Sequence, residues 1–279
     1  MLVDFHIHTT ASDGTLTPEQ LVGEIEKHAI QYFAITDHDT IDGLKSLKEI
    51  PEGLLSVTGV EISAEFEKTL HILGYGFDLH DRGFNESLNE LQDYRKGRNQ
   101  QMLEKMSRFG MEITLEELID EAGSDLVGRP HFANLMVRKG YVSSFQEAFD
   151  NYLKKGAPLY MDKKRFDPDK AIEIIHAAGG IAVMAHPYQT KLEGRDLEHL
   201  VKKLVSYGLD GIEVFYSQHT PLMIREYMGF ASQYNLIATG GSDFHGANKP
   251  QIPLGVEVSE QDIQPFISFV CQRQRMHRG

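Results

Sequence analysis

The feature of this sequence that most constrains its fold is the alternation of short apolar segments with helix-like segments. Five apolar stretches predict strands: "YFAITDHD", "LLSVTGVEISAEF", "GIAVMAHPY", "DGIEVFY" and "LIATGGSDFHG". Helix signals stand between them, such as Thr17 before Pro18 and the pair Asp167-Pro168. Nearly continuous apolar strands separated by helices favour parallel pairing, so the pattern predicts an α/β barrel or a doubly wound sheet.

One segment in the middle of the chain interrupts this alternation. It contains successive helix signals and no strand candidate, and Thr114 with Glu117 forms one of its capping-box pairs. We therefore predict an all-helical insertion at residues 99–156. The barrel would then consist of residues 1–98 and 157–279.

Composition and charge exclude several classes of protein. The 279 residues include 28 Lys and Arg but 41 Asp and Glu, which gives a formal net charge of −13. This charge argues against broad electrostatic capture of nucleic acid, although bound cations would still permit an anionic substrate. The single cysteine, Cys271, excludes an internal disulfide. Because no segment reads as a signal peptide or a membrane span, we expect a cytoplasmic protein with no membrane contact and no stable protein partner.

The N-terminal segment "VDFHIHTTASDG" contains two histidines, His6 and His8, one residue apart, and then Asp13 in a turn. Alternate residues of a strand project from the same side, so both imidazoles could bind one ion. Asp243 and His245 have the same spacing near the other end of the chain. A polar edge strand is the alternative explanation for the first segment taken alone.

Further histidines and carboxylates stand at the ends of predicted strands, where the catalytic groups of a parallel barrel converge. The complete set comprises His6, His8, Asp13, His38, Glu61, His71, His186, Asp243 and His245. Each residue alone could be a hydrogen-bonded core residue, but together they would leave buried charges uncompensated unless cations bind. Nitrogen and oxygen ligands suit Zn, Mn or Fe(II). Because one tetrahedral site needs only three or four ligands, we expect two or three divalent ions.

The ordered motifs HIH, SDG, TDHD, GVEIS, AHP and SDFH resemble those of the PHP (polymerase and histidinol phosphatase) family of metal-dependent phosphoesterases. The resemblance is strongest to members with 3′,5′-nucleotide bisphosphate phosphatase and 5′-to-3′ exoribonuclease activity. It includes the chain length, the insertion and the segment "GRPH". Membership of this family would imply a distorted seven-stranded β/α barrel that holds a trinuclear metal site.

The same resemblance implies how the ligands divide among three ions. The first ion would take His6, His8, Glu61 and Asp243, the second Glu61, His71 and His186, and the third Asp13, His38 and His245. Glu65 is the alternative to Glu61 in this assignment. Asp243 and His186 would take part in catalysis only through the metals, and no side chain would act as the nucleophile. We expect metal-bound hydroxide to attack phosphorus, because two ions that share a water lower its pKa from about 16 to near 7.

The segment "GRPHFANLMVRKG" places Arg129 and His131 at the start of a helix whose first turn contains Pro130. Free N–H groups at a helix N-terminus bind anions, and the planar guanidinium of arginine suits phosphate. We expect Arg129 and His131 to bind a second, non-scissile phosphate. The alternatives are a surface ion pair for Arg129 and a helix cap for His131.

These features predict a metal-dependent phosphoesterase that hydrolyses the 3′-phosphate of nucleoside 3′,5′-bisphosphates and can also trim short 5′-phosphorylated RNA from its 5′ end. One alternative is a histidinol-phosphate-type phosphatase, against which the "GRPH" segment argues. Another is a non-catalytic metal-binding PHP module, against which the complete ligand set argues. Tyr160 and Tyr216 stand where they could stack on a base or pack in the protein, and the role of His219 stays open.

Overall fold

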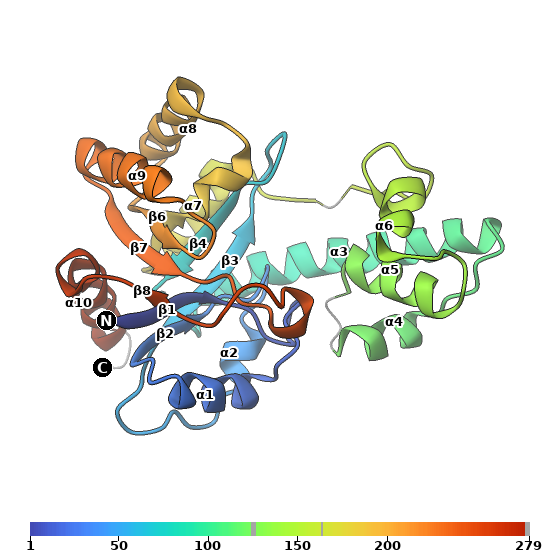
Figure 1. Ribbon diagram of the computed structural model, residues 1–279, viewed down its shortest axis with the longest axis horizontal. Helices are drawn as coiled ribbons and strands as arrows, with labels where there is room; N and C mark the ends of the chain where they lie inside the picture. The colour runs from blue at the N-terminus through green and yellow to red at the C-terminus, as the bar shows by residue number, and fades with distance from the viewer. Residues whose placement is uncertain (124–126, 163, 277–279) are drawn as a thin grey trace.

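The computed structural model describes residues 1–123, 127–162 and 164–276, which form a barrel-like sheet with outer helices and a separate helical lobe (Figure 1). The strands are β1 (Leu2–Ile7), β2 (Tyr32–Ile35), β3 (Leu55–Ser63), β4 (His71–Tyr75), β5 (Ile181–Met184), β6 (Gly211–Tyr216), β7 (Ile237–Gly241) and β8 (Val256–Glu257). Their spatial order is β7-β6-β5-β4-β3-β2-β1-β8. The predicted α/β barrel is confirmed, with one short strand, β8, beyond the seven expected.

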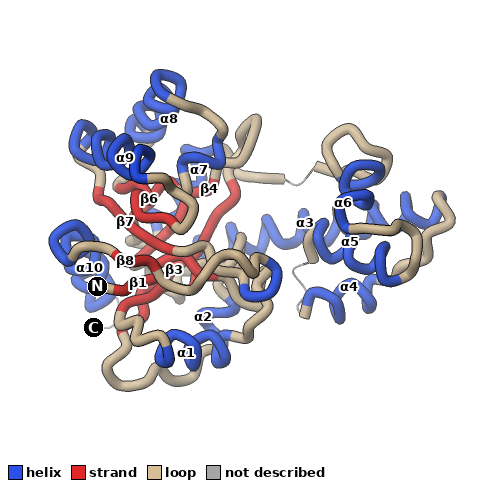
Figure 2. The backbone as a smooth tube through the Cα atoms, in the orientation of Figure 1, coloured by secondary structure: helices blue, strands red, loops and turns tan. Residues whose placement is uncertain are grey.

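Helices cover the outside of the sheet and build the lobe (Figure 2). They are α1 (Pro18–Lys27), α2 (Asp42–Ser46), α3 (Arg82–Arg108), α4 (Leu115–Ala122), α5 (Arg129–Arg138), α6 (Phe145–Ala148), α7 (Pro168–Ala177), α8 (Gly194–Ser206), α9 (Pro221–Tyr234) and α10 (Glu260–Met276). Among the described residues there are also a short π-helix, η1 (Phe149–Leu153), and two short 3-10 helices, η2 (Pro187–Thr190) and η3 (Gly246–Asn248). In the described residues, no helix combines the length and the hydropathy needed to cross a membrane.

Strand pairing is mixed, which corrects the expectation of an entirely parallel sheet. Strands β1, β2 and β3 are parallel, as are β5, β6 and β7, but β4 runs antiparallel to both of its neighbours. The physical reason is the short connection, residues 64–70, between β3 and β4. A parallel pair needs a crossover of about a dozen residues or more, so this connection permits only a reversal. Strand β8 also pairs antiparallel, with β1.

The sheet closes where the end of β7 meets β1. The backbone N–H of Asp243 donates to the carbonyl of His6 at 2.8 Å, and the N–H of His8 donates to the carbonyl of Phe244 at 2.9 Å. Gly241 permits this approach, because a Cβ at that position would lie only 2.3 Å from Cβ of His6. The closure brings the two histidine-containing segments of the sequence together, although they stand at opposite ends of the chain.

The barrel interior is closed at its other end by apolar side chains. The ring of Phe266, from α10, lies 4.8 Å from Phe5 and 5.1 Å from Tyr75 between ring centroids, and all three are buried. Phe5 lies inside β1, His6 lies near its C-terminal end, and His8 directly follows the strand. Apolar packing therefore fills one end of the barrel and leaves the polar residues gathered at the opposite rim.

The helical lobe has a hydrophobic core of its own. Buried residues of α3, α4, α5 and the segments after them pack together there, among them Met102, Leu118, Phe132, Met136 and Leu153. Helix α3 begins well before residue 99 and runs from the barrel into the lobe (Figure 1). The two parts of the chain thus share one continuous helix, and the domain limits at 99 and 156 stay a prediction.

Candidate metal centre

The nine predicted ligand residues all lie at the polar rim of the barrel, within a single network of contacts. His8, His38, His186 and His245 follow the ends of β1, β2, β5 and β7. His71 instead starts its strand, β4. Because β4 runs antiparallel to its neighbours, its first residue reaches the same rim as the last residues of the others.

Glu61 is the centre of this network, and its side chain is fully buried. Its Oε1 lies 2.7 Å from Nδ1 of His71 and 2.8 Å from Nε2 of His186. Its Oε2 lies 2.9 Å from Nδ1 of His38 and 3.2 Å from Nε2 of His8. The two oxygens of one carboxylate therefore face different imidazoles, as the oxygens of a bridging ligand do.

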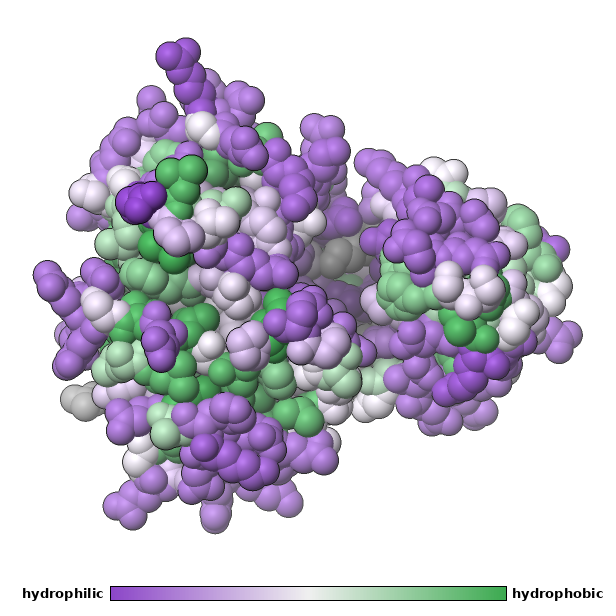
Figure 3. Space-filling view, in the orientation of Figure 1, coloured by the Kyte–Doolittle hydropathy of each residue, from purple (hydrophilic) through white to green (hydrophobic). Residues whose placement is uncertain are grey.

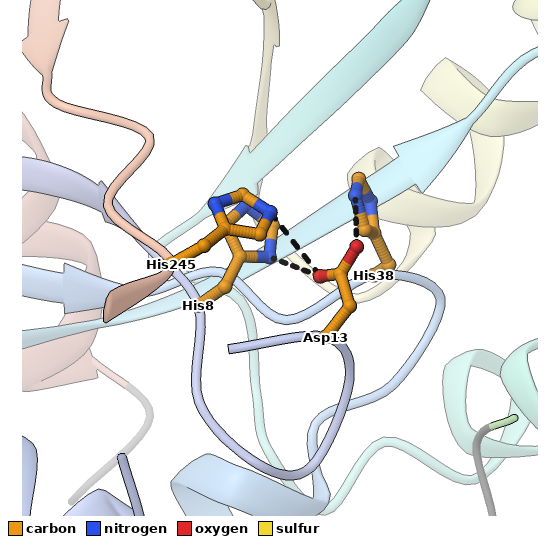
Figure 4. A group of neighbouring side chains, drawn as sticks. All are labelled: His8, Asp13, His38 and His245. Carbon is orange, nitrogen blue, oxygen red and sulfur yellow. Dashed lines mark ion pairs between the residues drawn. The ribbon is translucent and has the colours of Figure 1, made fainter. Parts of the chain in front are cut away.

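Three groups of these side chains place their ligand atoms within 4.8 Å of one another: His6, His8, Glu61 and Asp243; His8, Asp13, His38 and His245; and His38, Glu61 and His71. The imidazoles of the second group surround the carboxylate of Asp13 (Figure 4). The first group equals the set implied for the first ion. The second group is the set implied for the third ion with His8 added. The third group is the set implied for the second ion with His38 in place of His186. How the ligands divide among the ions therefore stays a prediction.

The donor atoms themselves show whether cations fit this cluster. Several buried atoms form no hydrogen bond of acceptable geometry within the described part of the chain, although other polar atoms lie close to them, namely Nε2 of His6, His8 and His245, Nδ1 of His38 and Oε2 of Glu61. Each such atom costs about 1–3 kcal/mol if it stays unsatisfied. Nε2 of His245 lies 3.2 Å from a carboxylate oxygen of Asp13, close to the ligand spacing of a tetrahedron whose metal–ligand distances are about 2.0–2.1 Å. The residues present therefore fit divalent cations.

Electrostatics keep the carboxylates of the cluster ionised. Burial alone would raise the pKa of Glu61, but the imidazoles of His71 and His38 more than offset burial and hold this pKa well below its usual range. The same balance of burial against imidazoles lowers the pKa of Asp13 and Asp243. Burial also lowers the pKa of His71 to about 4. At neutral pH, anionic oxygens and a neutral imidazole are then available as ligands.

A buried glutamate behind the ligands, Glu213, orients two of them. Its Oε1 lies 2.9 Å from Nδ1 of His6, and its Oε2 accepts the backbone N–H of His186 at 2.6 Å. Because a carboxylate can only accept, Nδ1 of His6 must donate, so the neutral form of this imidazole directs the lone pair of Nε2 toward the cluster. Glu213 was not among the residues that the sequence predicted for the site. Its position inside the apolar strand "GIEVFY" was the available signal, since a buried carboxylate requires partners.

Two residues that were not predicted to contact the ligand cluster, Tyr216 and Lys249, hold the carboxylate of Asp243. The hydroxyl of Tyr216 donates to Oδ2 at 2.7 Å, and Nζ of Lys249 donates to the same oxygen at 2.8 Å. Tyr216 is buried, so it packs at the rim and does not offer a face for base stacking. The backbones of Asp243 and His186 adopt positive φ angles of 60° and 22°. Such conformations are uncommon outside glycine and cluster at functional sites.

His131 and Arg129 lie at the start of α5, where they were expected. Nδ1 of His131 accepts the backbone N–H of Gly128 at 3.0 Å, so this side chain caps the helix. The guanidinium of Arg129 lies 5.1 Å from the ring centroid of Tyr160 and donates to the carbonyl of Leu153 at 3.4 Å. Within the described residues it forms no ion pair with a carboxylate. The surface ion pair considered for Arg129 is therefore absent from the described structure.

Arg129 belongs to a group of arginines between the barrel and the lobe. Arg98 is buried, and its guanidinium donates to Asn99 at 2.7 Å and to a backbone carbonyl, with no carboxylate partner among the described residues. Burial first, and then the charges of Arg95, Arg129 and Arg165, lower the pKa of Arg98. In a chain of net charge −13 this local positive charge favours an anionic ligand. On the face shown in Figure 3, hydrophilic side chains alternate with hydrophobic ones over the barrel and gather on the parts of the barrel and the lobe that face each other.

Two further residues from the sequence reading are now placed. Glu65 is exposed and lies 3.2 Å from Arg165, so Glu61 and not Glu65 occupies the cluster. His219 is buried behind the rim, where its Nδ1 lies 2.9 Å from the carbonyl oxygen of Val214. Its contact with a carbonyl oxygen identifies Nδ1 as the donor, and His219 does not reach the ligand cluster.

Comparison with known proteins gives matches over most of the chain. Residues 4–252 match the family described as PHP domain. The 5′-3′ exoribonuclease Rnm of Escherichia coli (strain K12) is 34% identical over 269 residues, which cover 92% of each chain. The 3′,5′-nucleoside bisphosphate phosphatase of Chromobacterium violaceum is 30% identical over 268 residues, covering 95% of this chain and 93% of that protein.

A solved structure shows the same architecture. The crystal structure of a protein described as a metal-dependent phosphoesterase from Bifidobacterium adolescentis superposes on this chain with a TM-score of 0.81. The two are 28% identical in sequence, and the superposition covers 94% of each chain. The similarity thus extends through both the barrel and the helical lobe.

Proposed function

Because this chain belongs to the PHP domain family and is a metal-dependent phosphoesterase, we propose that it removes the 3′-phosphate from nucleoside 3′,5′-bisphosphates. We also propose that it trims short 5′-phosphorylated RNA from the 5′ end. The observation that carries this choice of substrate is the group of arginines beside the ligand cluster, two of which, Arg98 and Arg129, have no carboxylate partner among the described residues. A cytoplasmic location is part of the proposal.

The metal content is proposed as two or three divalent ions, Mn, Fe or Zn, held by the nine residues of the rim. When bound, such ions lower the pKa of water for attack on phosphorus and neutralise charge on the phosphoryl group. Glu61 supplies two oxygens to the centre of the site, and Glu213 fixes the orientation of His6. No serine or cysteine nucleophile is required.

One bond breaks in both substrates, the bond between phosphorus and the 3′-oxygen. Water adds to phosphorus, and the 3′-oxygen leaves and takes up a proton. A bisphosphate then gives a nucleoside 5′-phosphate and inorganic phosphate. An RNA gives a nucleoside 5′-phosphate and a chain that is one nucleotide shorter and carries a new 5′-phosphate, so the reaction can repeat.

The 5′-phosphate of either substrate is proposed to bind at Arg129 and at Nε2 of His131, the ring nitrogen that the helix cap does not use. Burial of Arg98 beside Arg129 strengthens attraction to an anion, because charges interact more strongly where water is excluded. His131 is close enough to Asp13 for that carboxylate to raise the pKa of His131, although burial has the larger effect and lowers it. This influence of Asp13 on His131 supports a phosphate site beside the ligand cluster, as a substrate with two phosphates requires.

A substrate comparison tests this function. The chain would be stripped with a chelator, reconstituted with Mn, Fe(II) or Zn, and supplied with adenosine 3′,5′-bisphosphate, AMP, histidinol phosphate and a short 5′-phosphorylated RNA. We expect the bisphosphate and the RNA to be hydrolysed far faster than AMP or histidinol phosphate. Preference for histidinol phosphate would establish the alternative phosphatase, and the absence of hydrolysis with every metal would contradict the proposal.

The role of Arg129 can be separated from that of the metals. Arg129→Ala should lower kcat/KM for the bisphosphate by about 10–100-fold, because a charge-assisted contact to phosphate is lost. Arg138→Ala is the matched control, since Arg138 lies at the other end of α5 and pairs with Glu121. Unchanged selectivity for two phosphates over one in Arg129→Ala would show that the second phosphate binds elsewhere.

A further inference from the structure

A separate polar cavity of about 350 Å³ opens in the barrel beside the ligand cluster. Its walls include Tyr188, Gln189, Lys191, Gln218, Lys249 and Gln251. All the described residues that line it belong to the barrel part of the chain, and none comes from the helical lobe. The arginine group and this cavity are therefore different surfaces around the same rim.

The cavity is continuous with the ligand cluster through direct contacts. Nε2 of Gln189 donates to the hydroxyl of Tyr216 at 3.2 Å, and this hydroxyl donates to Oδ2 of Asp243 at 2.7 Å. Nζ of Lys249, a wall residue, also donates to Oδ2 of Asp243 at 2.8 Å. Tyr188 lies in η2, which begins directly after His186. The cavity wall and the ligand cluster are therefore direct neighbours.

The walls have the chemistry of a nucleotide site. Tyr188 is half-buried, and Nζ of Lys191 lies 4.9 Å from its ring centroid. An aromatic ring of this kind stacks on a base of any identity, and a nearby ammonium attracts the phosphate backbone. The glutamines of the walls have amides that can both donate and accept. Among the described residues that line the cavity there are two lysines and no carboxylate, although the chain has a net charge of −13.

We propose that this cavity binds the nucleotide that follows the scissile phosphate in an RNA substrate, an inference that rests on the proposed function. Cleavage of the bond to the 3′-oxygen leaves phosphorus attached to the 5′-oxygen of that next nucleotide. A nucleoside 3′,5′-bisphosphate has no such nucleotide. The cavity thus contributes to the hydrolysis of RNA and not to that of the free bisphosphate, with Tyr188 stacking on the base and the ammonium of Lys191 donating to polar groups of that same nucleotide.

The test compares two substrates that differ only in the second nucleotide, adenosine 3′,5′-bisphosphate and the 5′-phosphorylated dinucleotide pApA. The ratio of kcat/KM for pApA to kcat/KM for the bisphosphate is measured in the metal-reconstituted full chain. Lys191→Ala should lower this ratio about tenfold, chiefly through KM for pApA, and Lys191→Arg should retain most of it. Lys203→Ala is the matched control, because Lys203 also lies over a tyrosine ring, that of Tyr207, on α8.

The outcomes separate this inference from the proposed function. A reduced ratio in Lys191→Ala, with the ratio of Lys203→Ala unchanged, supports the second-nucleotide site. An unchanged ratio in Lys191→Ala overturns it, and so does an equal loss on both substrates. If the unaltered chain hydrolyses the bisphosphate but not pApA, the inference fails while the phosphatase function stands. Failure to hydrolyse either substrate contradicts the proposed function itself.

Discussion

Replacing Gly241 with alanine tests whether the closure between β7 and β1 sets the geometry of the metal centre. The added Cβ would lie 2.3 Å from Cβ of His6, 2.5 Å from its backbone nitrogen and 2.9 Å from its Cα. Non-bonded carbon atoms approach no closer than about 3.5 Å without strain, so the two strands must separate by about 1 Å at this point. These atoms belong to the strand and the root of a side chain, so no flexible group can move aside.

The size of the effect follows from that displacement. Overpacking of this kind costs about 1–3 kcal/mol, which corresponds to a fall in Tm of roughly 2–10 °C for a chain of this size. A shift of about 1 Å in the position of reacting groups lowers activity about 100-fold. We therefore expect Gly241→Ala to fold, to lose metal affinity through displacement of His6, and to retain about 1% of the phosphoesterase activity.

The assay combines the metal content of the purified protein, hydrolysis of adenosine 3′,5′-bisphosphate and thermal unfolding. Gly229→Ala is the matched control, because Gly229 lies within α9 and an added Cβ there meets nothing within 4 Å. That control should be more stable by about 0.5–1 kcal/mol, since alanine favours a helix. Full metal content together with full activity in Gly241→Ala would refute the reasoning.

Three further predictions concern the rim. Glu213→Gln should keep the fold but lower metal affinity about 10–100-fold, because His6 loses an anionic acceptor. Competition with a chromogenic chelator measures the affinity, and an unchanged value would contradict the role of Glu213. Removing metal with a chelator should abolish phosphoesterase activity and lower Tm, since a cation that binds only the folded state stabilises it; full activity in metal-free protein would rule out the proposed chemistry. Asp4→Asn should lower the free energy of unfolding by about 3 kcal/mol, because Asp4 accepts hydrogen bonds from Ser242 at 2.6 and 2.8 Å and from Gly255 at 2.7 Å. Urea unfolding measures this change, and an unshifted midpoint would count against it.

The gathering of the candidate ligand residues at one rim was predictable because period-two geometry and strand ends leave direct marks in a sequence. His6 and His8 share a face of β1 by alternation alone, and Asp243 with His245 follows β7 in the same way. The alternation of apolar segments with helical segments along the chain also predicted the α/β class. It could not predict the direction of β4, which depends on the length of one connection, and that direction explains why His71 starts its strand at the rim.

Partners that join distant parts of the chain left no comparable mark. Lys249 reaches Asp243 from a loop, and Glu213 reaches His6 from β6, contacts that only the closed barrel creates. Arg98 stands in the basic run "YRKGRNQ", a pattern that is typical of a solvent-exposed surface. Its burial depends on packing of α3 against the lobe, which no local pattern encodes.

Helix α3 has a consequence for which molecules the protein can accept. It continues without a break from the barrel into the lobe, and Arg95 within it donates to Asp39 at the rim at 2.6 Å. A continuous helix resists bending, so the spacing between the rim and the lobe is set by backbone pitch, about 1.5 Å for each residue. Selection by molecular length would then be a property of the scaffold. Changing it would require adding or removing whole helical turns, and exchanging single side chains would not suffice.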